Sequence, residues 1–174
     1  MAFNIAVPPV TFKTRITTED SPGFKWGEIT TDEIFANKRI ALFGLPGAFT
    51  PTCSSTHLPG FEANYDEIIN GGVDEVYCLS VNDSFAMNAW FSSLDIQNVK
   101  ALPDGKGEFS RKMGFLVDKS NLGFGMRSWR YSMIVNNGIV EMMWVEEGMD
   151  DNVEDDPFQV SDAYTMIEYL QQKR

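Results

Sequence analysis

Residues 39–44 read RIALFG and residues 45–61 read LPGAFTPTCSSTHLPGF, and this stretch predicts a strand that leads directly into a helix. The first part is a short, mostly apolar run that ends at a turn signal, which is typical of a buried strand. Thr50 is a good helix N-cap, and Pro51 follows where a helix tolerates proline because that first-turn N–H would have no partner. We therefore expect a helix to begin at about Thr50, with Cys53 in its first turn.

A cysteine in the first turn of a helix is a candidate nucleophile. The unpaired N–H groups and the positive end of the helix dipole point toward its sulfur, and both favour the thiolate. Pro46, Thr50 and Cys53 form the pattern P-x-x-x-T-x-x-C. In that pattern the Thr50 hydroxyl can hydrogen-bond both the sulfur and a bound oxygen, and Pro46 gives a rigid apolar wall. A buried, inert cysteine would be the default interpretation of Cys53 without this surrounding run.

This pattern resembles the active-site signature of the peroxiredoxins, which are thiol-dependent peroxidases. The longer run over residues 46–61 is similar to that of the type II, or peroxiredoxin-5-like, subfamily, and the resemblance extends over essentially the whole chain. It implies that the Cys53 thiolate attacks hydrogen peroxide or an organic hydroperoxide and becomes a sulfenic acid. It also implies that Thr50 helps to hold the peroxide and that Pro46 shields the sulfur.

Such a thiolate needs a permanent positive charge beside it, and arginine also offers several N–H donors in a fixed geometry. Arg127 and Arg130 both lie in the segment Met-Arg-Ser-Trp-Arg-Tyr-Ser, residues 126–132. Arg130 directly precedes an aromatic residue at a strand start, as the active-site arginine of the family does. We therefore expect Arg130 to act on Cys53. Arg127 is the weaker candidate, for which a surface position is favoured over a supporting role at the site.

Two further side chains have competing interpretations. Cys78, in a predicted core strand, could resolve the sulfenic acid of Cys53, but a small buried apolar side chain is the favoured interpretation. His57 lies four residues after Cys53 on the same helix face, and we expect a structural or supporting role for it. One cysteine and one histidine are too few ligands for a metal site. The acidic run 148–157 lacks the calcium-loop pattern and reads as a solvated loop, and no phosphate or dinucleotide motif predicts an organic cofactor.

The order of elements predicts an α/β fold: a mixed central sheet with helices on both faces and an N-terminal hairpin extension. It is similar to the thioredoxin-like fold, and we expect one domain over residues 1–174. Pro59 should kink the helix about one turn past Cys53, and Asn137-Gly138 predicts a hairpin. The predicted strands are 11–15, 24–29, 39–44, 75–81, 98–102, 128–135 and 139–145, and the predicted helices are 32–35, 50–69, 84–91, 108–113 and 161–172.

Composition limits the partners and the compartment. A formal net charge of −11 argues against nucleic acid or an anionic membrane as a partner. Two cysteines in 174 residues are no disulfide framework and fit a reducing compartment, so we expect a cytoplasmic protein.

The family resemblance also implies an external thiol reductant and commonly a homodimer. With no convincing resolving cysteine, glutathione with glutaredoxin is favoured over thioredoxin. A disulfide reductase would need C-x-x-C, whereas Thr50 and Thr56 occupy the positions three residues either side of Cys53. A non-enzymatic redox-sensing or chaperone-like binding module on the same fold is the remaining alternative.

Overall fold

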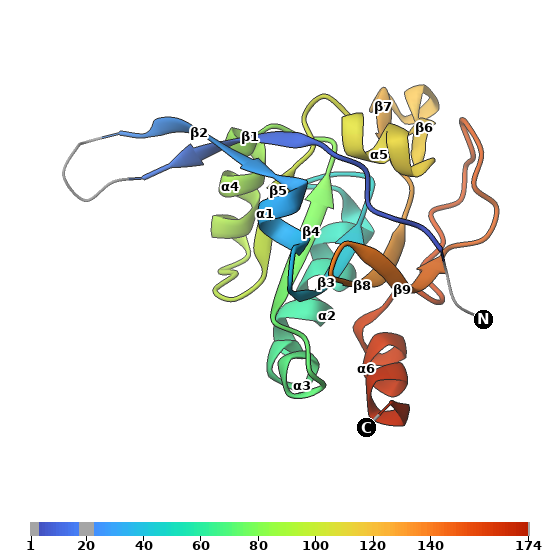
Figure 1. Ribbon diagram of the computed structural model, residues 1–174. Helices are drawn as coiled ribbons and strands as arrows, with labels where there is room; N and C mark the ends of the chain where they lie inside the picture. The colour runs from blue at the N-terminus through green and yellow to red at the C-terminus, as the bar shows by residue number, and fades with distance from the viewer. Residues whose placement is uncertain (1–3, 18–22, 174) are drawn as a thin grey trace.

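A mixed five-stranded sheet forms the centre of the molecule. The computed structural model describes residues 4–17 and 23–173, and the strand order in the sheet is β5-β4-β3-β8-β9 (Figure 1). The first three strands are mutually parallel, and β8 and β9 are antiparallel to their neighbours. Their bounds are β3 Arg39–Gly44, β4 Glu75–Ser80, β5 Lys100–Pro103, β8 Tyr131–Asn136 and β9 Ile139–Val145. The predicted mixed sheet is thereby confirmed.

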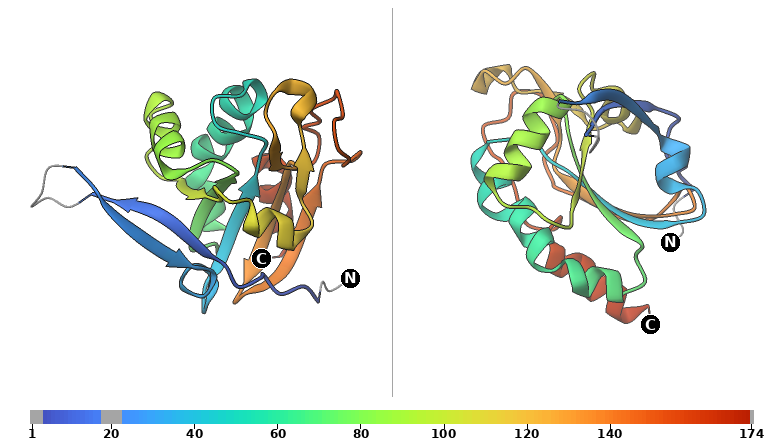
Figure 2. Two further views of the ribbon diagram at one scale, coloured as in Figure 1. Left: turned by 90° about the horizontal axis from the view of Figure 1, so that it is seen from above. Right: turned by 90° about the vertical axis from the view of Figure 1, so that its left-hand side faces the viewer.

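Apolar residues of the strands alternate between the two faces of the sheet. Ala41 and Phe43 belong to one core cluster and Ile40 and Leu42 to the other, as a period of two requires. The first cluster is covered by α2 (Leu58–Ala63), α3 (Tyr65–Asn70), α4 (Ser84–Ser93) and α6 (Ala163–Gln172). The second is covered by α1 (Thr31–Phe35), α5 (Glu108–Met113) and the N-terminal strand β1 (Thr11–Ile16), so helices lie on both faces (Figure 2).

The N-terminal hairpin extension is also present. Strand β1 pairs antiparallel with β2 (Lys25–Thr30) in a separate two-stranded sheet. This hairpin projects from the body of the molecule as an arm (Figure 1). The turn that joins the two predicted strands, 11–15 and 24–29, lies mostly outside the described residues.

Side-chain caps define the starts of two helices, and the predicted hairpin turn is confirmed. Thr30 accepts a hydrogen bond from the Glu33 N–H at the start of α1, and Asp83 caps α4 by accepting from the Ala86 N–H. Asn137 and Gly138 both have positive φ, 48° and 79°, which is the geometry of the two-residue hairpin turn between β8 and β9.

The helix expected over residues 50–69 is not one kinked helix. Residues 53–57 form a π-helical turn in which the Leu58 N–H bonds the Cys53 carbonyl, and α2 and α3 follow as separate helices. Pro59 offers no N–H, and its ring cannot lie against the carbonyl one turn earlier, so the chain widens before it. The irregularity therefore begins at Cys53 itself rather than one turn beyond it.

Other boundaries also differ from the prediction. The strand expected over 128–135 is interrupted, and its first part pairs elsewhere: β7 (Met126–Ser128) forms a small sheet with β6 (Leu116–Asp118), beside a 3-10 turn at Ser120–Leu122. The last helix starts at Ala163 with Asp162 as its N-cap, because the amide and hydroxyl of Ser161 are bound by Glu146. In the described ranges no helix is long and apolar enough to cross a membrane.

Candidate active site

Cys53 lies where the helix follows the loop after β3. Its side chain has no solvent exposure and packs in the helix-side core, and it is a free thiol. The Ser54 N–H bonds the Thr50 carbonyl, so Thr50 occupies the N-cap position and Cys53 lies in the first turn, as predicted. The Thr50 hydroxyl does not cap the helix, however, because it donates to the Gly47 carbonyl at 2.6 Å.

Arg130 reaches Cys53 from between β7 and β8. Its Nη2 lies 3.4 Å from the Cys53 Sγ, and the arginine itself is only 1% exposed. Burial acts to lower the pKa of Arg130, but the negative charges of Cys53 and Asp156 together outweigh burial and raise that pKa. The structure therefore places a permanent cation in direct contact with the sulfur.

His57 lies beside this pair and is completely buried. Its Nε2 is 3.0 Å from the Ser161 carbonyl oxygen, which can only accept, so Nε2 carries the hydrogen. Its Nδ1 is then free to accept from Arg130 Nη1 at 2.9 Å. Burial, and then the charge of Arg130, hold the pKa of His57 well below its usual value. His57 is thus a neutral support for the arginine, in line with the supporting role expected from the sequence.

Asp156 binds the outer edge of the same guanidinium, and the sequence did not reveal it. Its carboxylate accepts from Arg130 Nε at 3.2 Å and from Nη2 at 2.8 Å on both oxygens. The ring of Phe158 lies 5.6 Å from the Arg130 Cζ and 4.7 Å from the imidazole of His57. The acidic loop, expected to be merely solvated, is therefore part of this site.

Glu146 anchors the end of that loop. It is 2% exposed, and its carboxylate accepts the backbone N–H groups of residues 159–161 at 2.8–3.3 Å and the Ser161 hydroxyl at 2.5 Å. The Ser161 carbonyl bound by His57 is held in place by these bonds. A buried carboxylate with this many donors marks a fixed loop rather than a solvated one.

The loop before Cys53 is supported by Arg127. This arginine is half-buried rather than at the surface, which corrects the expectation, and it donates to the Pro46 carbonyl at 3.3 Å and to Asn82 Oδ1 at 3.4 Å. A Cβ on Gly47 would collide with the Arg127 guanidinium, so glycine allows this close approach. Pro46 itself is buried. Phe49 has φ of 63°, a left-handed conformation that costs a residue with a Cβ about 1–2 kcal/mol.

Lys119 is a further buried cation near the site that the sequence did not reveal. It is 2% exposed, and its Nζ lies 5.4 Å from the centre of the Trp129 ring. Burial lowers the pKa of Lys119, while the negative charges of Asp156 and Cys53 oppose that change. Among the described residues, no group of three or more His, Cys, Asp or Glu side chains could hold a metal ion.

Cys78 lies on β4 in the same core cluster as Cys53, and both cysteines are free thiols. It has no solvent exposure. Burial raises the pKa of the Cys78 thiol well above its usual value, the charge of Cys53 adds to this, and Arg130 opposes it. Cys78 therefore has the environment of a small apolar core residue.

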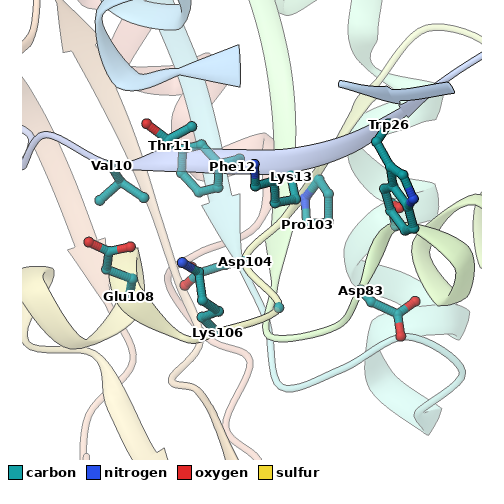
Figure 3. Close-up of a pocket in the computed structure, with 12 residues that line it drawn as sticks. Val10, Thr11, Phe12, Lys13, Trp26, Asp83, Pro103, Asp104, Lys106 and Glu108 are labelled. Carbon is teal, nitrogen blue, oxygen red and sulfur yellow. The ribbon is translucent and has the colours of Figure 1, made fainter. Parts of the chain in front are cut away.

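A cavity lies elsewhere, under the N-terminal arm. It has a volume of about 630 Å³, and Phe12, Trp26 and Pro103 contribute apolar walls (Figure 3). None of the four residues predicted to act in catalysis lines it. The cavity is therefore separate from the surroundings of Cys53.

The neutral His57 predicts a pH-dependent stability. An unfolded histidine titrates near pH 6.5, whereas the pKa of His57 in the folded protein is well below that value, so the unfolded state binds the extra proton. The contribution of neutral His57 to the free energy of unfolding is therefore complete above about pH 6.5, and it is lost as the pH falls below that value. Between pH 7.5 and 5.5 we expect the free energy of unfolding to drop by about 1.4 kcal/mol, measured by urea denaturation.

His57 is the only histidine of the chain, which makes the control simple. His57→Gln should remove this part of the pH dependence, because carboxylates titrate at lower pH. An equal drop in the variant would contradict the assignment.

Comparisons with known proteins agree with this geometry. The chain matches the Redoxin family over residues 24–167. A peroxiredoxin of Synechocystis sp. is 56% identical over 167 residues, 94% of this chain and 88% of that protein. "Hybrid peroxiredoxin hyPrx5" of Haemophilus influenzae is 52% identical over 164 residues, which span 94% of this chain and 64% of the relative.

A solved structure shows the same fold. The crystal structure of the Plasmodium falciparum antioxidant protein, described as a 1-Cys peroxiredoxin, superimposes with a TM-score of 0.91 at 38% identity, covering 97% of this chain and 99% of that one. The predicted thioredoxin-like fold is confirmed by this match. The chain therefore belongs to the redoxin family, among the peroxiredoxins of the type II, peroxiredoxin-5-like subfamily.

Proposed function

We propose that this protein reduces hydrogen peroxide and organic hydroperoxides through Cys53. The observation that supports this most directly is the contact of 3.4 Å between Arg130 Nη2 and the Cys53 Sγ, inside a site where both residues are buried. A guanidinium donor on the sulfur stabilises the thiolate, which is the reactive form.

In the proposed step the thiolate attacks the terminal oxygen of the hydroperoxide. A sulfur–oxygen bond forms, the O–O bond breaks, and Cys53 is oxidised to sulfenic acid. The other oxygen leaves with the electron pair and takes a proton to become water or an alcohol. Arg130 stabilises the negative charge that develops on this leaving oxygen.

Thr50 and Pro46 complete the proposed site. Because the Thr50 hydroxyl donates to the Gly47 carbonyl, its oxygen is oriented to accept a hydrogen bond, and the O–H of the peroxide can supply one. Buried Pro46 keeps water from the sulfur. The backbone N–H groups of the first helical turn add further donors.

We further propose that an external thiol reduces the sulfenic acid. Cys78 is buried in a central strand that pairs with β3 on one side and β5 on the other. A disulfide with Cys53 needs Cα atoms within about 7 Å, so we do not expect Cys78, held in this strand, to resolve the sulfenic acid. Glutathione with glutaredoxin is therefore the favoured reductant over thioredoxin. A cytoplasmic homodimer remains the expected working form.

The test is the intact mass of the protein after one equivalent of hydrogen peroxide, without reductant. Wild type and Cys78→Ser should both gain one oxygen, or further oxygens with excess peroxide. Loss of two hydrogens in wild type but not in the variant would instead show a Cys53–Cys78 disulfide and favour a thioredoxin-type reductant. An unchanged mass in both proteins, with peroxide left unconsumed, would overturn the proposed function.

A further inference from the structure

Arg130 and Asp156 form an ion pair whose two members differ in exposure. The Arg130 side chain is 1% exposed, whereas the Asp156 side chain is 36% exposed. The carboxylate therefore covers the guanidinium on the side that faces solvent. A molecule that approaches Arg130 from this side meets the negative charge of Asp156 first.

The five N–H groups of the guanidinium are divided between two edges. Nε and one N–H of Nη2 face Asp156, with contacts of 2.8–3.2 Å. Nη1 and the other N–H of Nη2 face His57 and Cys53. This second edge is therefore the one that faces the thiol site. A bidentate carboxylate fixes the plane of the guanidinium, and that plane decides which N–H groups face the sulfur.

Asp156 belongs to a segment that is itself held in place. Glu146 binds the backbone after it, at residues 159–161, and Phe158 packs against His57. Before it, the Asn152 N–H donates to the Asp118 carbonyl at 2.7 Å. With both flanks bound, the Asp156 carboxylate is not a freely moving surface charge.

We propose that Asp156 is a positioning residue for Arg130 and that its charge makes the site select uncharged hydroperoxides over anionic ones. The inference rests on the proposed peroxidase function of Cys53. Asp156 holds one edge of the guanidinium so that the other edge points at the sulfur and the bound peroxide. The occupied edge is the one that would otherwise bind the carboxylate of an anionic hydroperoxide.

Loss of the Asp156 charge has two effects of opposite sign. Three cations, Lys119, Arg127 and Arg130, interact with the charge of Cys53, while His57 is neutral. Asp156 offsets part of the positive charge of Arg130, so without the carboxylate the positive charge beside the sulfur is stronger. The guanidinium is also less well fixed, so attack on hydrogen peroxide becomes slower even when all of the sulfur is thiolate. A purely structural role would not produce both changes together.

The experiment compares Asp156→Asn with Asp155→Asn as a matched control. Asp155 is exposed and is the preceding residue of the same loop, so both variants lose one charge at nearly the same place. The readouts are kcat/KM for hydrogen peroxide, the pH midpoint of Cys53 alkylation by iodoacetamide, and the rate ratio for a short carboxylated alkyl hydroperoxide over its methyl ester. Circular dichroism and thermal unfolding check the fold of each variant.

For Asp156→Asn we expect kcat/KM for hydrogen peroxide to fall about 10-fold. The alkylation midpoint should move down by about half to one pH unit, and the ratio of anionic to ester substrate should rise about 5-fold or more. Asp155→Asn should change each value by less than about 2-fold or 0.2 unit. If the two variants behave alike while wild type is active, the inference is overturned and the proposed function stands. If wild type consumes no peroxide, the proposed function fails and the inference falls with it.

Discussion

Replacement of Cys53 by serine should abolish peroxide consumption and leave the fold intact. A serine hydroxyl stays protonated at neutral pH and is a far weaker nucleophile than a thiolate, so no sulfenic acid can form. The serine is close to cysteine in size, and its oxygen can accept the Arg130 N–H that now faces the sulfur. We expect kcat/KM for hydrogen peroxide to fall by about 10⁴-fold or more, to the rate without enzyme.

Cys78→Ser is the matched control, because it makes the same change at another fully buried position of the same core. It should retain turnover with glutathione and glutaredoxin. Preserved turnover in Cys53→Ser would contradict the mechanism. Loss of turnover with every reductant in a folded Cys78→Ser protein would instead make Cys78 the resolving cysteine.

Arg130→Gln should have the second-largest effect, a fall in kcat/KM of about 10²–10³-fold. The substitution removes the donor on the Cys53 Sγ and the permanent positive charge beside it. The fold should tolerate the change better than most buried charge deletions, because the abandoned carboxylate of Asp156 is 36% exposed and can be hydrated. Steady-state peroxide assays at saturating reductant measure the effect.

Arg127→Gln serves as the comparison for this prediction. Arg127 contacts the Pro46 carbonyl and Asn82 but makes no hydrogen bond to the sulfur. We expect less than about a 10-fold fall in kcat/KM, from a loosened loop alone. Equal losses in the two variants would mean that overall positive charge, rather than direct contact, is what the reaction needs.

Much of the scaffold could be predicted because its signals are local. Strand β3 and helix α5 have the predicted bounds, and the hairpin turn at Asn137-Gly138 follows from the left-handed conformations these residues adopt readily. The π-helical turn at Cys53 could not be predicted in this way. Its 58-to-53 hydrogen bond depends on how the chain widens before Pro59 while Cys53 and His57 remain buried. The three-residue strands β6 and β7 are too short to show a period.

The residues of the site also differ in whether local sequence could predict them. The run around Cys53 predicted Pro46, Thr50 and the nucleophile, and the strand start predicted Arg130, which the structure brings within hydrogen-bonding distance of the sulfur. Nothing local distinguishes Asp156 from its acidic neighbours, because its role depends on the path of a loop. The one available signal was Phe158, an aromatic residue directly after an acidic run, which indicates a loop that packs onto the protein.

The Glu146 anchor has a consequence for how the thiol site depends on this loop. Glu146 binds main-chain amides at residues 159–161, and His57 binds a main-chain carbonyl at Ser161. These contacts use main-chain groups, so the anchor itself does not depend on the side chains of the intervening segment. The thiol site therefore depends on this loop in two ways, through its main-chain anchor at residues 159–161 and through the side chains of Asp156 and Phe158.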